Sequence, residues 1–600
     1  MNLNSMNEQG DRWAMRIVSK SRTPFTERIK KDKARSQKEW CRIIIQYCVP
    51  RITQNYPELH PAVEIDLSKK SFLIVDDHQA MRNGIAEMLY SSGADDVDKA
   101  ARGGEAITRL KERRYDAVLC DYNLGRGKNG QQVLEEVKFR KFIPYSTVFI
   151  MISGDSSLAV VMGAMEYKPD DYLTKPFPKE LVITRLNRHF GRKQIFKTLD
   201  RALSAGLFMK ALEQCTVLLG QANKRNRMEL LKLQSDLFLE VGDYDQASII
   251  FCEVLMDRRA PWAQVGQARV YYYKERYELA EKLLTQVIEE LPSTLDAYDW
   301  LSKTHLAQGD KIKAEAVLEQ AVELSPKAIL RHQTLARLAE RNGSIDLAEQ
   351  SFRNAIQLGQ NSIHRHCSDD SKLAGICGKR GRSEEALEII KSMRYEFKGD
   401  VEAELRAMMA ETVIFQEKGD EKRAKESLLK SLALAGQSDQ VLPSEVALDL
   451  ARMSYLSGDK KTAEKLIHDL VRQNIDGGLV LDDLKAICKE LGLESLIEES
   501  ISEARKEVIK INNEGVRLFD EGKVQEAIRH LERAIEGMPG NKTVLMNMVK
   551  IMLHDMKTSG ADKRKLNRTK RYIDRAVKLG LPGDKLKDSL TEFHRLMNVA

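Results

Sequence analysis

A glycine followed five residues later by an alanine recurs through the last two thirds of this 600-residue chain. Glycine favours the positive φ that a tight turn after a helix often requires, and alanine leaves room for two helices to cross closely. The pattern predicts an all-α array of helix pairs from about residue 197 onward. The pairs are Gly206/Ala211, Gly242/Ala247, Gly309/Ala314, Gly343/Ala348, Gly381/Ala386, Gly419/Ala424, Gly458/Ala463 and Gly522/Ala527, while Glu275 replaces the glycine before Ala280.

The spacing and the companion residues of this pattern define a family resemblance. The alanines Ala280, Ala314 and Ala348 are 34 residues apart, twice in succession. In several units a larger apolar residue follows four positions after the alanine, at Phe251, Leu284, Leu318 and Phe352. A proline closes the unit at Pro292, Pro326 and Pro539. This resembles the tetratricopeptide repeat, whose period is about 34 residues. The resemblance implies a solenoid whose curved surface binds peptides or proteins and has no chemistry of its own.

The repeat pattern is uneven along the chain. It is strong over 230–360 and 510–540 and loosens over 360–480. It is almost lost over 470–505, which indicates either a degenerate unit or a break between two blocks.

The region before the repeats alternates between strand and helix patterns five times. Such alternation is typical of a parallel sheet covered by helices on both faces, here a flavodoxin-like, doubly wound α/β domain. The expected strands are 71–76, 97–101, 115–121, 147–153 and 170–174, and the expected helices are 78–92, 103–114, 130–140, 156–166 and 178–190.

Polar side chains end four of these strands. Asp76 and Asp77 follow the first strand, Asp121 ends the third, Ser153 ends the fourth and Lys175 follows the fifth. Ligands of open parallel sheets bind beyond the carboxyl ends of the strands. We therefore expect three carboxylates, one hydroxyl and one ammonium in a single crevice.

This set of groups suits phosphoryl transfer to a carboxylate. Asp121 needs no base to become a nucleophile at neutral pH, but an anionic donor repels it. Oxygen ligands from neighbouring acids suit Mg²⁺, which would offset that repulsion. Lys175 can neutralise one phosphoryl oxygen and Ser153 can donate a hydrogen bond to another.

Residues 71–190 resemble the receiver domain of bacterial two-component response regulators, with a layout close to the chemotaxis receiver. The resemblance implies that Asp121 accepts a phosphoryl group from a histidine kinase or a phosphotransfer protein. It also implies that Asp77, Asp121 and the carbonyl group of Asn123 bind Mg²⁺, while Asp76 acts mainly through water. The chain is then no enzyme beyond its own phosphorylation and dephosphorylation.

Three further positions take roles from the same resemblance. Ser153 and Tyr172 correspond to the hydroxyl and the aromatic residue of the switch. Asn123 and Asp155 lie two residues beyond Asp121 and Ser153, where the family tunes the lifetime of the acyl phosphate. A polar pair there can orient a water molecule, so we expect hydrolysis over minutes rather than hours.

We expect five segments along the chain. They are a basic extension with one amphipathic helix at 1–70, the receiver domain at 71–190, a helical linker or first half-repeat at 191–228, tetratricopeptide-type repeats at 229–470, and degenerate and C-terminal repeats with basic capping helices at 471–600.

Charge and hydropathy limit where we expect the protein to be located and which partners we expect it to bind. No apolar run approaches the ~18 residues of a membrane span, and the first residues lack a signal-peptide core. With eight scattered cysteines, we expect a cytoplasmic protein in a reducing compartment. Residues 1–70 hold 14 Lys and Arg against 8 Asp and Glu, which accounts for most of the net charge of +7.

Two clusters admit other interpretations. His364, His366, Cys367 and Cys377 could hold a metal ion, but their spacing matches no usual zinc pattern and favours a surface loop. A basic run could contact nucleic acid, although a solvated helix face fits it better; the run is Lys563, Arg564, Lys565, Arg568, Lys570, Arg571 and Arg575.

The sequence thus predicts a phosphorylation-controlled regulator whose repeats bind another protein. Receiver–repeat regulators are a bacterial arrangement, and one partner class that the resemblance implies is a cyclic-di-GMP enzyme. A homodimer is also compatible with the pattern. Two alternatives stay open: a scaffold that ignores phosphorylation, and a regulator that binds nucleic acid through its basic segments.

Overall fold

The computed structural model describes residues 65–155, 163, 166–437, 442–475, 479–538, 540–579 and 583–599. These residues belong to one compact unit, Val63–Ala600. The predicted amphipathic helix over 36–55, most of the predicted helix over 156–166, and Pro539 lie outside the described residues.

The first part of this unit is a five-stranded parallel sheet in the order β2-β1-β3-β4-β5. This confirms the predicted doubly wound α/β fold, with strand ends that differ from prediction by one or two residues. The elements are β1 Ser71–Val75, α4 Gln79–Tyr90, β2 Asp96–Ala100, α5 Gly103–Glu112, β3 Ala117–Asp121, α6 Gly130–Phe139, β4 Val148–Ser153, β5 Asp171–Thr174 and α8 Lys179–Lys193.

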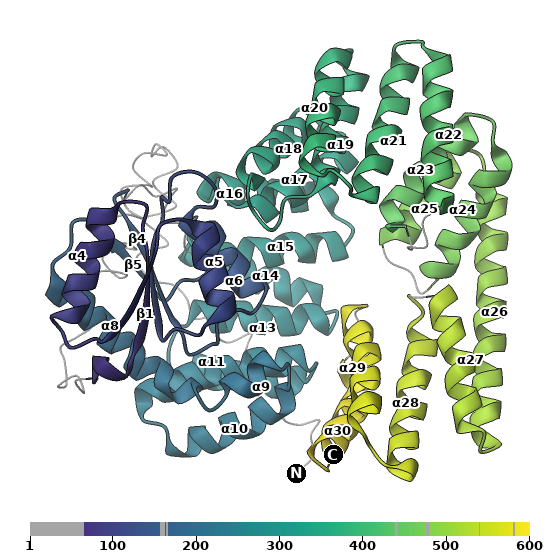
Figure 1. Ribbon diagram of the computed structural model, residues 1–600. Helices are drawn as coiled ribbons and strands as arrows, with labels where there is room; N and C mark the ends of the chain where they lie inside the picture. The colour runs from purple at the N-terminus through teal and green to yellow at the C-terminus, as the bar shows by residue number, and fades with distance from the viewer. Residues whose placement is uncertain are drawn as a thin grey trace. The chain divides into compact units, whose positions relative to one another are not determined.

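Helices cover both faces of the sheet because its central strands are apolar on both sides. Along β3, Val118 and Cys120 pack toward α5 and α6, whereas Ala117 and Leu119 pack toward α4 and α8. Figure 1 shows these two helix pairs on opposite sides of the strands. The edge strand β2 is more polar and only partly buried.

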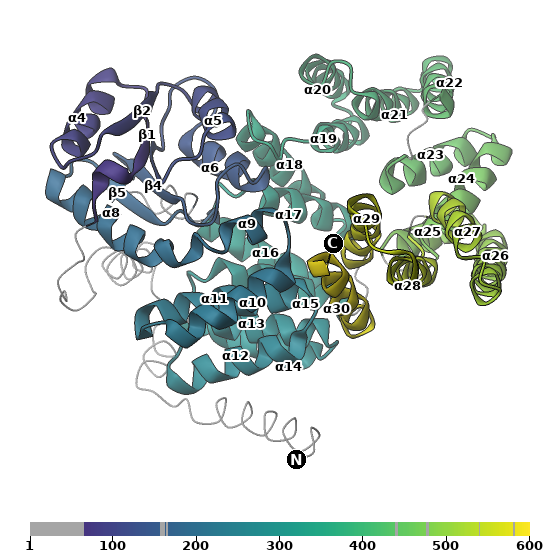
Figure 2. The ribbon, with the colours of Figure 1, turned by 60° about the horizontal axis from the view of Figure 1, so that its bottom comes forward.

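The rest of the chain, as far as the structure describes it, is helical. Consecutive helices pack against each other, and Figure 2 shows α20, α21 and α22 side by side. The helices are α9 Asp200–Ser204, α10 Phe208–Gln221, α11 Lys224–Glu240, α12 Tyr244–Asp257, α13 Pro261–Tyr273, α14 Tyr277–Glu290, α15 Leu295–Ala307, α16 Lys311–Leu324, α17 Ile329–Asn342, α18 Ile345–Gly359, α19 Cys367–Lys379, α20 Ser383–Glu396, α21 Val401–Glu417, α22 Glu421–Gln437, α23 Ser444–Leu456, α24 Lys460–Gln473, α25 Leu479–Glu490, α26 Glu494–Asp520, α27 Val524–Gly537, α28 Lys542–Ser559, α29 Lys563–Lys578 and α30 Gly583–Val599.

The turns between paired helices have the predicted backbone conformation. All eight glycines of the repeat have positive φ, from 67° at Gly206 to 90° at Gly458. Glu275, which replaces the glycine in one unit, has φ 59°. The alanine that follows each turn is buried between helices, as at Ala280, Ala314 and Ala348, each with no exposed surface.

The segment in which the repeat pattern fades remains helical. There α25 is followed by α26, a helix of 27 residues that packs against α24 and α27. A turn glycine does recur there, at Gly492 between α25 and α26 with φ 70°, but Ile497 replaces the alanine that would follow five residues later. No described helix is long and apolar enough to cross a membrane.

Candidate functional site

The four predicted strand ends meet at one edge of the sheet. Register places Asp121 beside Ile152, and Ser153 beside Thr174, the residue before Lys175. Asp76 directly follows β1, which pairs with β3. Parallel pairing therefore brings Asp76, Asp121, Ser153 and Lys175 to the same edge, as the sequence predicts.

Lys175 joins two of the acids. Its Nζ lies 2.8 Å from Asp76 Oδ2 and 3.0 Å from Asp121 Oδ1. Burial acts to lower the pKa of Lys175, but the hydrogen bonds to Asp76 and Asp121 outweigh it and raise that pKa. The ammonium group thus stays charged and fixes the two carboxylates.

Asp121, the candidate nucleophile of the site, is almost fully enclosed. The residue is 5% exposed, and burial is the main cause that raises the pKa of its carboxyl group. Lys175 opposes that rise, whereas the negative charges of Asp76 and Asp77 add to it. The pocket therefore has more negative charge than Lys175 alone can balance.

This donor set fits a magnesium ion. Carboxylate oxygens are the ligands that Mg²⁺ prefers, and the excess negative charge would be offset by a divalent cation. One ligand atom each from Asp76, Asp77 and His78 lies within 4.8 Å of the others. Asp76 and Asp77 are the predicted acid pair; His78 was not predicted.

His78 orders the acid pair from its exposed position. Its backbone N–H donates to Asp76 Oδ1 at 2.8 Å, and its Nδ1 lies 2.8 Å from Asp77 Oδ1. A Cβ atom at Gly125 would lie 3.2 Å from Asp77 Oδ2, so the loop after β3 closes on this carboxylate. The only sequence signal for His78 is that it directly follows the pair.

Ser153 and Tyr172 lie together on the other side of Asp121. The Ser153 Oγ accepts a hydrogen bond from the Asp155 N–H at 3.0 Å, and the Tyr172 hydroxyl donates to the Asp155 carbonyl oxygen at 2.9 Å. Tyr172 is 6% exposed and packs in the core with Met151. Its ring is thus already inward in this structure.

Gly130 closes the loop after Asp121, a role that the sequence analysis did not predict. A Cβ atom at Gly130 would lie 2.1 Å from the Asp121 carbonyl oxygen. Any larger residue would push α6 away from the acceptor, so α6 begins directly against Asp121. Asn123, a predicted ligand and tuning residue, is exposed within this loop.

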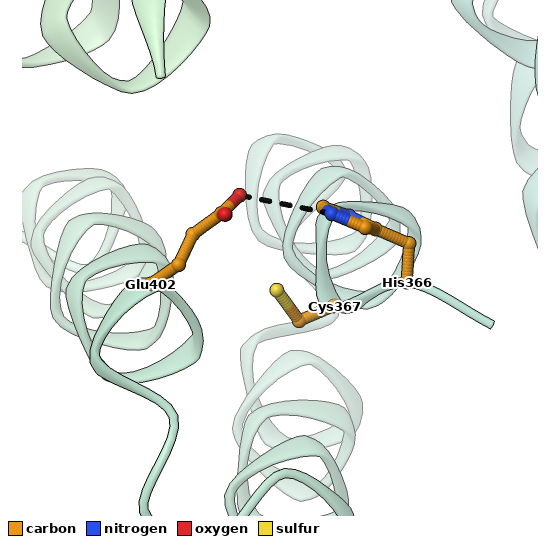
Figure 3. Close-up of side chains that lie close together, drawn as sticks. All are labelled: His366, Cys367 and Glu402. Carbon is orange, nitrogen blue, oxygen red and sulfur yellow. Dashed lines mark ion pairs between the residues drawn. The ribbon is translucent and has the colours of Figure 1, made fainter. Parts of the chain in front are cut away.

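The residues of the histidine–cysteine cluster in the repeats make contacts that stabilise the fold. Figure 3 shows His366, Cys367 and Glu402 close together, with His366 Nε2 3.9 Å from Glu402 Oε1. His366 caps α19 by accepting from the Ser368 N–H, and Glu402 Oε1 accepts from the buried Arg406. Burial is the main cause that raises the pKa of the Cys367 thiol to about 12, which disfavours the thiolate that a metal needs. Cys377 lies outside this group of three.

The basic residues of α29 are partly paired within the repeats. Arg568 Nε lies 3.1 Å from Glu532 Oε1, Lys565 Nζ lies 2.9 Å from Asp555 Oδ2, and Lys570 Nζ donates to the Ala205 carbonyl oxygen at 2.8 Å. These contacts favour a packed helix over a nucleic-acid surface.

Comparison with known proteins identifies both parts of the chain. Residues 72–187 match the family model of the response regulator receiver domain, and residues 265–329 match a tetratricopeptide repeat model. The chain thus contains a receiver domain followed by tetratricopeptide repeats.

Three solved structures are each similar to a part of this chain. A CheY-like receiver domain protein from Methanospirillum hungatei JF-1 is 25% identical, with 21% of this chain and 96% of that chain covered and a TM-score of 0.19. CheY4 of Vibrio cholerae is 25% identical, with 20% and 98% covered and a TM-score of 0.19. The MamA RS-1 ArsTM double mutant is 23% identical, with 29% and 97% covered and a TM-score of 0.25.

Proposed function

We propose that the receiver domain accepts a phosphoryl group on Asp121 from a histidine kinase or phosphotransfer protein, and that this modification modulates protein binding by the repeats. One observation carries the proposal: Lys175 lies within 3.0 Å of Asp121 and 2.8 Å of Asp76, at the edge where Ser153 also ends its strand. This combination of groups suits an acceptor pocket rather than a solvated surface.

The transfer step follows from these positions. A carboxylate oxygen of Asp121 attacks the phosphorus atom and forms an O–P bond. The P–N bond to the donor imidazole, or the P–O bond of a small donor, breaks and its electron pair leaves with that group. Lys175 neutralises one phosphoryl oxygen, and Ser153 donates its hydroxyl proton in a hydrogen bond to another.

Magnesium belongs to the same proposal. Asp77, Asp121 and the carbonyl group of Asn123 would hold Mg²⁺, with Asp76 contributing through water. When bound, the ion offsets the charge of the acids and of the incoming phosphoryl group. Lys175 and Ser153 then position the phosphoryl oxygens.

Asn123 and Asp155 set the lifetime of the acyl phosphate in this proposal. Asn123 is exposed two residues after Asp121, and the backbone of Asp155 is fixed by Ser153 and Tyr172. Polar side chains at these two positions can orient a water molecule for hydrolysis. The phosphoryl group should therefore be lost within minutes, and a label that persists for many hours in purified protein contradicts this part.

The repeats supply the output. Their partner is a protein, and a cyclic-di-GMP enzyme is the class that the resemblance to bacterial receiver–repeat regulators implies; a second copy of this chain is the other candidate. A coupling of about 1–3 kcal/mol between the two sites would change partner affinity about 5–150-fold.

An affinity pull-down from native lysate tests the function. Wild-type protein and the Asp121→Ala variant are compared with and without beryllofluoride, which stands in for the phosphoryl group. We expect beryllofluoride to change the amount of a captured partner for wild type and not for Asp121→Ala. Asp95→Ala, an exposed acid outside the pocket, is the control. Equal capture by wild type and by Asp121→Ala, with and without beryllofluoride, would support a scaffold that ignores phosphorylation.

A further inference from the structure

The receiver contacts the repeats through α6 and the turn before β5. We call this contact the clasp. Its receiver side consists of Lys128, Gln132, Glu135, Phe139 and Glu166–Tyr167. Its repeat side consists of Lys327, Arg331 and Gln360–His364. Its residues are 165 to 233 positions apart in the chain.

Arg331 on α17 is the first anchor of the clasp. Its guanidinium forms two hydrogen bonds to the Glu166 carboxylate, at 2.6 and 3.2 Å, and two to Asp299 on α15, both at 2.9 Å. The side chain is 4% exposed. Burial alone would lower the pKa of Arg331, but these hydrogen bonds outweigh it and raise that pKa. A buried fork with four bonds fixes the orientation of both partners.

Glu135 is the second anchor. It lies on α6, is 1% exposed, and accepts a hydrogen bond from the Ser362 hydroxyl. The His364 ring packs edge-on to Phe139 at 5.6 Å and parallel to Tyr167 at 6.4 Å, with Nε2 3.6 Å from Glu135 Oε1. One oxygen of a carboxylate buried on the receiver, Glu135 Oε1, thus takes its hydrogen bond from the repeats.

Main-chain groups of the α18–α19 loop complete the contact. Gln132 Nε2 donates to the Gln360 carbonyl oxygen at 2.8 Å, and Lys128 Nζ donates to that of Asn361. Gln132 also forms the capping box of α6 with Asn129. One member of the capping box of α6 therefore also binds the repeats.

The clasp lies next to the acceptor. α6 begins at Gly130, against the Asp121 carbonyl oxygen. Tyr122, the next residue after Asp121, donates from its hydroxyl to Gln131 Oε1 at 3.2 Å. The Lys327 Nζ lies 5.2 Å from the centre of the Tyr122 ring and 3.4 Å from its hydroxyl oxygen. A phosphoryl group on Asp121 adds about −1.5 to −2 charge one residue from this contact.

We infer that the α6 face of the receiver is a docking surface for the chain's own repeats, and that clasp closure and phosphorylation of Asp121 are coupled. The coupling rests on the function proposed above; the docking does not. Because coupling between two equilibria is reciprocal, opening the clasp must change the phosphorylation of Asp121, and phosphorylation must change the clasp.

Amide hydrogen exchange of the full chain tests the docking. Two variants remove the first anchor from either side, Arg331→Ala and Glu166→Ala. The control is Arg341→Ala, which removes an exposed ion pair with Asp483 from the same helix, α17. We expect faster exchange in α6 and in residues 358–366 for both anchor variants and not for the control. Exchange in these segments that stays at the wild-type rate in both variants overturns the docking.

Labelling by acetyl phosphate with Mg²⁺ tests the coupling in the same proteins. We expect the extent of labelling at Asp121 to differ at least about 5-fold between Arg331→Ala and Arg341→Ala, and beryllofluoride to change exchange over 358–366 in wild type. Equal labelling together with unchanged exchange overturns the coupling. If wild type itself takes no label, the proposed function fails, while the exchange of the anchor variants still decides the docking.

Discussion

At the scale of single residues, Lys175 and the acids around it explain why this pocket suits a phosphoryl group. One ammonium group contacts two carboxylates. Burial raises the pKa of Asp121, and the negative charges of Asp76 and Asp77 add to that rise. A divalent cation would offset this charge. Stability should therefore respond to Mg²⁺.

Magnesium should stabilise the receiver through Asp77. An ion that binds only the folded state raises stability by RT ln(1 + [L]/Kd), about 2.7 kcal/mol at one hundred times Kd. We expect Mg²⁺ to slow amide exchange in β1 and β3 of wild type, and the chelator EDTA to reverse the effect. Asp77→Ala should lose most of this response, whereas Asp95→Ala should keep it. A full response in Asp77→Ala would exclude this residue as a ligand.

Asp171 gives a prediction about pH. It is 6% exposed and lies 3.1 Å from Arg185 Nη1 and 2.7 Å from His189 Nε2. Burial alone would raise the pKa of Asp171, but the hydrogen bond from His189 and the nearby positive charges outweigh it and lower that pKa. A lowered pKa stabilises the fold above the ordinary value of about 3.9, and this contribution is lost as pH falls through the folded-state pKa.

Asp171→Asn should therefore cost about 3–5 kcal/mol near pH 7, because it leaves buried cations without their counter-ion. The cost should begin to shrink as the pH falls below about 4, where Asp171 of the unfolded chain takes up a proton, and it should vanish once the pH falls through the lowered pKa of Asp171 in the folded protein. Amide exchange of β5 and α8 in the full chain, at pH 7 and at acid pH, measures both effects. Asp95→Asn is the exposed control. A cost that is the same at both pH values would contradict the assigned ion pairs.

At the scale of the elements, the turns between helices are where sequence and structure agree most closely. Every glycine of the repeat has positive φ, and so does Glu275. The left-handed conformation costs a residue with a Cβ atom about 1–2 kcal/mol, while glycine costs about 0.4–1 kcal/mol more in unfolded-state entropy.

Glu275→Gly should therefore stabilise the α13–α14 pair by about 0.5–1 kcal/mol. The reverse change, Gly343→Ala, should destabilise α17–α18 by a similar amount, since nothing lies within 4 Å of its added Cβ and only the backbone conformation resists it. Amide exchange of each helix pair measures both changes. A less stable Glu275→Gly protein would show that the Glu275 side chain contributes more than its backbone costs.

The features that could be predicted from the sequence are those whose residues form a pattern within one short segment. The acceptor edge was predictable because Asp76, Asp121, Ser153 and Lys175 each stand at the end of a strand, and parallel pairing brings such ends together. Gly130 and His78 escaped prediction because their roles depend on how the loops close. Arg331 and Glu166 meet across 165 residues, and no local pattern of either segment indicates that they are partners.

At the scale of the whole molecule, the described contacts join Asp121, the proposed phosphoryl acceptor, to the repeats by a short path. Asp121 abuts the start of α6, and α6 holds the α18–α19 loop through Gln132 and Glu135. Helix α8 also joins the two domains along the chain, through the short helix Gln194–Phe196 that leads to α9. The clasp is a second and more direct route, because α6, which carries most of its receiver side, begins against Asp121.

The most direct measurement maps the phosphoryl group after the full chain has been incubated with acetyl phosphate and Mg²⁺. Peptide mass spectrometry should find a single phosphoryl group on Asp121 in wild type, no modification in Asp121→Ala, and little modification when EDTA replaces Mg²⁺. A wild-type chain that stays unmodified, or a label that persists in Asp121→Ala, would contradict the assignment on which the account depends.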